Sequence, residues 1–125
     1  MAAVTDASLT SDELRLLERF VSELRNLLGD GLSAVWLFGS RARGEPAGED
    51  SDIDLLVLAD DASWDAKERI HAALALAATQ LDLAALTWDL SIHVHTPEWL
   101  RGRREIRSFF IAEVDRDKVV LHGEP

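Results

Sequence analysis

The sequence predicts an α/β fold in which a small mixed β-sheet is flanked by helices. Segments with a helical spacing of apolar residues alternate with short strand-like segments, in the order helix, strand, strand, helix, strand, helix, strand. The connection between the first two strands is too short for a parallel helical crossover, so the sheet cannot be all parallel. A chain of 125 residues allows one ordinary domain. We expect residues 11–122 to form this domain and residues 1–10 to be a flexible N-terminal segment.

The first helix is expected over residues 11–28. Thr10 and Glu13 have the spacing of a capping box, and Gly29 can close the C-terminus of the helix. The apolar residues that recur at helical spacing are Leu14, Leu17, Phe20, Val21, Leu24, Leu27 and Leu28.

Two strands joined by a polar loop follow this helix. Residues 33–38 are a short run rich in large apolar side chains, which is typical of a buried strand. The loop over residues 41–51 contains glycines, a proline and several acidic residues. The second strand is expected over residues 52–58, with Ile53, Leu55 and Val57 on one face and Asp52, Asp54 and Leu56 on the other.

The second half of the chain supplies the remaining elements. Ser63 is expected to cap a helix that extends to about residue 83, with an apolar stripe of Ile70, Leu74, Ala77 and Leu81. Residues 87–95 alternate between apolar and polar side chains, which predicts the third strand. Trp88 belongs to its apolar face, which we expect in the core. Pro97 opens a short helical turn, residues 104–115 are expected to be a helix, and residues 118–121 a last strand.

The composition argues against several classes of protein. There is no cysteine, which excludes disulfides and thiolate metal sites. The net charge of -10 argues against a dedicated nucleic-acid binder, which needs clustered basic residues. No apolar stretch approaches the roughly 20 residues of a membrane span, and the first residues lack the pattern of a signal peptide. We therefore expect a cytoplasmic protein that contacts neither nucleic acid nor a membrane directly.

The two aspartates of the second strand are the first candidate for a functional site. Asp52 and Asp54 lie two residues apart on a strand, so both side chains project to the same face. Two like charges held close together repel each other, and a cation removes the repulsion. Mg²⁺ binds in this way to one or two carboxylates together with phosphate oxygens. The pair alone is weak evidence, because aspartates near loops commonly form turns.

Gly39 and Ser40 are the second candidate. They follow the first strand, where backbone N–H groups can approach a phosphate without obstruction by a side chain. Arg41 and Arg43 come next and could contact phosphates, although a solvated loop is the alternative for both. A phosphate cradle that faces a cation site is the arrangement that nucleotidyl transfer requires.

On these motifs the sequence resembles the DNA polymerase β-like nucleotidyltransferases. Within that superfamily it is similar to the minimal nucleotidyltransferases that are often paired with HEPN-domain proteins. The motifs are LFGSRARG at residues 37–44 and SDIDLLV at residues 51–57. The resemblance implies the polymerase β-like nucleotidyltransferase fold and a third acidic residue on a later strand. Asp89 is the candidate for this residue, and Asp82 is its rival.

The resemblance also implies an activity. Asp52, Asp54 and Asp89 would be the catalytic residues and would hold two Mg²⁺ or Mn²⁺ ions. Gly39, Ser40, Arg41 and Arg43 would bind the phosphates of the substrate ATP. His93 and His95 share the face of Asp89 and are either a base or metal ligands, or ordinary polar residues of an open strand face.

A HEPN-type toxin is the partner that the resemblance implies. The chain would transfer AMP from ATP to a hydroxyl of that protein and act as its antitoxin in a hetero-oligomer, while a homo-oligomer stays possible. Two alternatives remain open at this point. One is nucleotidyl transfer to a small molecule such as an antibiotic, and the other is a non-catalytic antitoxin that acts by occlusion.

Overall fold

The computed structural model describes residues 3–45 and 52–125. Four α-helices, four strands and three short 3-10 helices follow one another in this part of the chain. In order they are η1 Val4–Asp6, α1 Ser11–Leu28, η2 Gly29–Gly31, β1 Leu32–Phe38, β2 Ile53–Ala59, α2 Trp64–Gln80, η3 Ala84–Asp89, β3 Leu90–His95, α3 Pro97–Glu105, α4 Phe109–Asp117 and β4 Val119–Gly123. None of the helices in the described residues is long and apolar enough to span a membrane.

The four strands form one mixed sheet in the order β3-β2-β1-β4. β1 is antiparallel to β2 and β4, whereas β2 and β3 are parallel. Phe38 in β1 pairs with Asp54 in β2, and Asp54 pairs in turn with Ser91 in β3. The C-terminal end of β1 therefore meets the N-terminal ends of β2 and β3 at one end of the sheet. The mixed sheet that the sequence predicts is confirmed.

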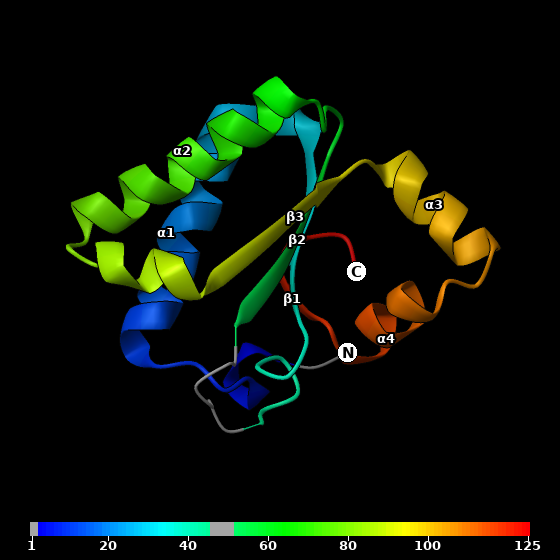
Figure 1. Cartoon of the computed structure of the whole chain (residues 1–125), viewed down its shortest axis with the longest axis horizontal. Coiled ribbons are helices and arrows are strands. Elements are labelled where there is room, and N and C mark those ends of the chain that lie inside the picture. The colour runs from blue at the N-terminus through cyan, green and yellow to red at the C-terminus, as the bar shows by residue number, and fades with distance from the viewer. Residues whose placement is uncertain (1–2, 46–51) are drawn as a thin grey trace.

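Helices cover both faces of this sheet, with α1 and α2 on one side and α3 and α4 on the other (Figure 1). The α1/α2 side holds the larger core cluster, which includes Leu16, Phe20, Leu55, Val57 and Ile70. The other side holds a smaller cluster with Trp36, Phe38, Leu56, Leu100 and Ile111. Because side chains alternate along a strand, Asp54 lies on the same side as Leu56, toward α3 and α4.

The helix signals read from the sequence are confirmed. The Thr10 hydroxyl accepts the N–H of Glu13, and the Glu13 carboxylate accepts the N–H of Thr10, so the capping box is complete. Gly29 ends α1 with a φ of 53°. The Ser63 side chain caps α2 as expected, by accepting the N–H of Ala66.

The third strand is shorter than the sequence predicts. Residues 87–89 belong to η3, because the Thr87 hydroxyl donates to the Ala84 carbonyl (2.7 Å) and the N–H of Leu90 bonds to the Thr87 carbonyl. Such local hydrogen bonds compete with strand pairing. The prediction that Trp88 lies in the core is wrong, since its side chain is 88% exposed.

Two other expectations differ from the structure. The helix expected over residues 104–115 is divided between α3 and α4, and Arg107 in the turn between them has a φ of 54°. A positive φ is not helical, so the helix cannot run through this residue. At the N-terminus, residues 3–10 are tied to the domain. The N–H of Ser8 donates to the Arg41 carbonyl (2.7 Å), and the Arg41 guanidinium donates to the Ser8 carbonyl (2.7 Å).

Candidate active site

Gly39, Asp52 and Asp54 lie together at the end of the sheet where β1 stops and β2 starts. Asp52 immediately precedes β2 and is exposed, whereas Asp54 is the second residue of the strand and is partly buried. Gly39 has a φ of 79°, and a Cβ placed on it would lie 2.6 Å from Oδ2 of Asp54. Only glycine fits here for two reasons. Residues with a side chain rarely adopt this positive φ, and a Cβ would collide with the Asp54 carboxylate.

The carboxylate of Asp54 is in an unfavourable electrostatic position. Burial raises its pKa, the neighbouring His93 lowers it in part, and the negative charge of Asp52 raises it again, so that the net pKa is above the ordinary value. A cation between the two aspartates would offset both the desolvation and the repulsion. The pair therefore fits a hard divalent ion that takes its remaining ligands from phosphates and water.

The strand beside these aspartates presents a serine and a histidine instead of a carboxylate. Ser91 pairs with Asp54 in the sheet, and the Ser91 hydroxyl lies 3.4 Å from Nε2 of His93. The His93 ring packs against Phe38 and Phe110, with ring centroids 5.5 Å and 6.4 Å away. The sequence leaves the role of His93 open, and in the structure His93 lies close enough to Asp54 to affect its pKa. The strand register, which the sequence does not reveal, is what brings them together.

Asp89 is the last residue of η3 and is exposed. It precedes Leu90, which pairs with Ile53, and so its backbone adjoins that of Asp52 at the same end of the sheet. Asp82 lies in the turn after α2, with a φ of 57°. Within residues 3–45 and 52–125, no three acidic, histidine or cysteine side chains are already arranged to hold a metal ion. The structure thus brings Asp52 and Asp54 together and leaves Asp89 beside them without a shared ligand cluster.

The two arginines after Ser40 have different surroundings. Arg41 is only 3% exposed, and its guanidinium pairs with Glu13 and donates to the Ser8 carbonyl. Hydrogen bonds from Thr10 and Arg41 outweigh the opposing effect of burial and lower the pKa of Glu13. The expectation that Arg41 contacts phosphates is therefore corrected: its side chain is directed into the protein and anchors the loop to α1.

Arg43 lies at the surface, and its expected contact with phosphates stays a prediction. Its guanidinium pairs with Glu45 (3.0 Å) and Asp117 (3.4 Å), and both ion pairs are partly exposed. Arg43 also lines a small cavity of about 130 Å³, and Gly39 lines the same cavity. The other residues around that cavity are Phe38, Phe110, Glu113, Val114 and Asp117.

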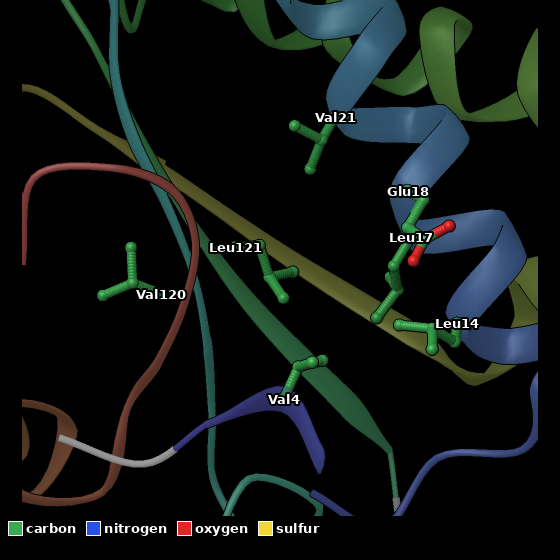
Figure 2. Close-up of a pocket in the computed structure, with 7 residues that line it drawn as sticks. All are labelled: Val4, Leu14, Leu17, Glu18, Val21, Val120 and Leu121. Carbon is green, nitrogen blue, oxygen red and sulfur yellow. The ribbon is translucent and has the colours of Figure 1, made fainter.

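A second cavity, of about 240 Å³, lies between η1, α1 and β4 (Figure 2). Its lining is apolar except for Glu18, with Val4, Leu14, Leu17, Val21, Val120 and Leu121 around it. None of the candidate site residues lines it. The end of the sheet at Gly39 and Asp54 is therefore the better candidate for chemistry.

The chain belongs to the nucleotidyltransferase domain family, whose model matches residues 15–121. This match confirms the family resemblance and the fold that the two motifs predict. No curated protein matched the sequence.

Solved structures of toxin–antitoxin proteins have a similar fold. A toxin–antitoxin crystallised with AMP-PNP is 25% identical over 86% of this chain and 73% of that one, with a TM-score of 0.52. Two mutant forms of the toxin–antitoxin MntA-HpeT are 23% and 22% identical, each with a TM-score of 0.51. These matches cover 93% and 86% of this chain and 74% and 73% of the other chains. At those two identities the similarity is evidence for the fold alone.

Proposed function

We propose that this chain is a metal-dependent nucleotidyltransferase that transfers AMP from ATP to a hydroxyl of a partner protein, a HEPN-type toxin. The observation that carries the proposal is the contact between Gly39 and Asp54. The turn at Gly39 has no room for a side chain and lies against the partly buried carboxylate of Asp54. The negative charge of Asp52 raises the pKa of that carboxylate. A phosphate-bound cation satisfies both features.

Each residue of the site has a proposed role. Asp52 and Asp54 hold a divalent ion, Mg²⁺ or Mn²⁺, together with the triphosphate, and Asp89 joins them at a second ion. Gly39 and Ser40 orient the β and γ phosphates through the turn after β1, and Arg43 contacts them from the surface. When bound, the two ions neutralise charge on the triphosphate and activate the acceptor hydroxyl.

The proposed reaction is an in-line displacement. The acceptor oxygen forms a bond to the α-phosphorus, and the bond from that phosphorus to the oxygen bridging to the β-phosphorus breaks. Pyrophosphate leaves with the electron pair of the broken bond. Asp89 accepts the proton of the acceptor hydroxyl in this proposal, which its exposure beside the start of β3 supports.

Three observations support a protein as the acceptor. The chain is small, so an acceptor with a surface of its own is oriented more easily for in-line attack than a small molecule. Its net charge of -10 steers a basic partner toward it. The similar structures are toxin–antitoxin proteins, one of which was crystallised with AMP-PNP. We extend the proposal to a cytoplasmic hetero-oligomer in which this chain is the antitoxin.

The test is to incubate the chain with the protein encoded by the neighbouring reading frame, ATP and Mg²⁺. Intact mass spectrometry should then find AMP added to that protein, and the Asp52→Asn variant should add none. Equal inhibition of the partner by wild type and Asp52→Asn, with no added mass, would overturn the enzymatic proposal. That outcome would leave an antitoxin that acts by occlusion.

A further inference from the structure

The turn between α3 and α4 exposes large apolar side chains at the surface. Ile106 is 68%, Phe109 79% and Phe110 39% exposed. We call these three residues the turn patch. Exposed apolar residues that lie together mark interaction sites more often than scattered ones do. Arg107 lies within the same turn at a φ of 54°, a conformation that persists in a non-glycine residue only where the surrounding structure holds it.

The turn is held in place by an ion pair between the two helices and by backbone bonds from the turn to α3. The Arg104 guanidinium donates twice to the Asp115 carboxylate, at 3.0 Å and 2.7 Å. The N–H of Ser108 donates to the Arg103 carbonyl at 2.9 Å, and the N–H of Arg107 to the Arg104 carbonyl at 3.1 Å. A surface that is already ordered loses little conformational entropy when it binds.

The turn patch continues into the candidate active site. The ring of Phe110 packs edge-on against that of Phe38, with centroids 5.5 Å apart, and Phe38 pairs with Asp54 in the sheet. Phe110 and Gly39 line the same small cavity. A protein seated on Ile106 and Phe109 would therefore extend past Phe110 toward the two aspartates. In Figure 1, α4 lies beside the lower part of the sheet, where β2 starts.

Arginine side chains lie beside the turn patch, although the whole chain is acidic. Residues 99–112 contain four arginines and one carboxylate, Glu105, while the charge of Arg104 is neutralised by Asp115, which lies beyond this segment. In the part of the chain that the structure describes, Arg103 and Arg107 make no ion pair, and Arg101 is 3.7 Å from Glu98 at an exposed position. Arg103 lies instead over the ring of Trp99, 5.5 Å from its centroid. The complementary ligand is an apolar segment flanked by carboxylates.

We infer that the turn patch docks the acceptor protein through an apolar segment with flanking acidic residues, and so directs its hydroxyl toward Asp52 and Asp54. This inference rests on the proposed function, because the occupant is the acceptor. The global negative charge and the local arginines act at different stages. The negative charge of the whole chain attracts a basic protein over a distance. The arginines beside the turn patch then orient one acidic segment of that protein when the two are in contact.

The test measures the Kd of the full chain for the protein encoded by the neighbouring reading frame, separately from AMP transfer. The double variant Ile106→Ser/Phe109→Ser should bind at least about tenfold more weakly, since anchors of this kind dominate interface energy. Arg107→Glu should also bind more weakly, and its deficit should shrink as salt is raised. The matched control is Trp64→Ser/Leu76→Ser on α2, which removes two exposed apolar side chains elsewhere and should leave the Kd unchanged.

Calorimetry with ATP and Mg²⁺ checks the turn-patch double variant for an intact nucleotide site, which should bind as in wild type. Unchanged partner affinity in the turn-patch variants, or an equal loss in the α2 control, overturns the docking surface even if AMP transfer occurs. Patch-dependent binding without transfer supports the docking surface and overturns the proposed reaction instead. If sedimentation shows that wild type self-associates and that the turn-patch variant is monomeric, the occupant is a second copy and the inference is wrong.

Discussion

Asp54 combines partial burial with a like charge at close range, and both raise its pKa. At neutral pH the carboxylate is therefore held ionised at some cost to folding when no cation is bound. Gly39 lies against this carboxylate, and a Cβ placed on it would be 2.6 Å from Oδ2 of Asp54. The same features that destabilise the metal-free protein would be relieved by a bound cation. A pKa perturbed in this way is common at functional sites, which supports the binding role proposed for Asp54.

The change Asp54→Asn should abolish transfer while leaving the fold intact or more stable. We expect transfer to fall by about 100-fold or more, because charge stabilisation at the reacting phosphate is lost. In EDTA at pH 7, the variant should melt at the same temperature as wild type or higher. Since the pKa of Asp54 is raised on folding, the penalty in wild type appears as the pH rises above the ordinary value of about 3.9 and is complete above the raised value.

Melting curves from pH 3 to pH 7 measure this directly. The gain of Asp54→Asn over wild type should vanish toward pH 3, where the carboxyl is protonated. Asp60→Asn, at the other end of β2 and exposed, is the matched control and should change neither transfer nor melting. Near-wild-type transfer by Asp54→Asn would show that the assigned site is wrong.

The change Glu13→Gln tests the buried ion pair with Arg41. It should lower the free energy of unfolding at pH 7 by about 3 kcal/mol, because it removes the charge of the carboxylate that pairs with the buried Arg41 guanidinium. The pKa of Glu13 is lowered, so this stability is present above the ordinary glutamate value and is lost as the pH falls through the lowered value. Urea unfolding at pH 7 and pH 3 measures the difference, which should be smaller at pH 3. The exposed pair of Asp12 and Arg15 gives the control, since Asp12→Asn should cost less than about 1 kcal/mol.

At the scale of elements, the beginning of β3 determines which group can act as the third ligand. The strand starts at Leu90 and directly follows η3, so Asp89 lies at the boundary between them instead of inside a strand. Ser91 is registered opposite Asp54, and His93, registered opposite Leu56, is close enough to lower the pKa of Asp54 in part. The sequence alternation alone would have put Asp89, Ser91 and His93 on one continuous strand face.

We expect Asp89→Asn to lower turnover at least about tenfold and Asp82→Asn to leave it unchanged. Asp89 adjoins Asp52 through the pairing of Leu90 with Ile53, whereas Asp82 lies in the turn after α2. Steady-state transfer rates at saturating ATP and Mg²⁺ distinguish the two variants. A loss in Asp82→Asn alone would move the third ligand to that residue. If turnover is unchanged in both aspartate variants and falls in His93→Gln, His93 is the third ligand.

At the scale of the whole molecule, the net charge leads us to expect that ATP binding depends on a metal ion. The chain carries a net charge of -10, and its candidate site contains aspartates that would face a polyanion. We expect calorimetry to find an affinity for ATP in Mg²⁺ or Mn²⁺ that falls at least about tenfold in EDTA at constant ionic strength. The Asp52→Asn variant should show a smaller metal dependence. Undiminished ATP affinity in EDTA would remove the metal from the proposal.

Local features of this protein were determined by its sequence. The capping box of Thr10 and Glu13, the cap at Ser63 and the alternation along β2 all follow from the spacing of neighbouring residues, because their hydrogen bonds and burial patterns are local. The two motifs around Gly39 and Asp54 predicted the family for a related reason. Each is short, and together they specify a turn and a carboxylate pair.

Only the tertiary structure decided which groups meet across the fold. Arg41 lies inside the protein because Glu13, far from it in sequence, offers a buried counter-ion. His93 adjoins Asp54 because β2 and β3 pair in one register, and a shift by one residue would turn it to the other face. Trp88 and Phe109 are residue types typical of a core, yet within the described part of the chain their side chains are 88% and 79% exposed. Periodicity shows which residues share a face, whereas long-range packing determines whether that face is buried, paired or open.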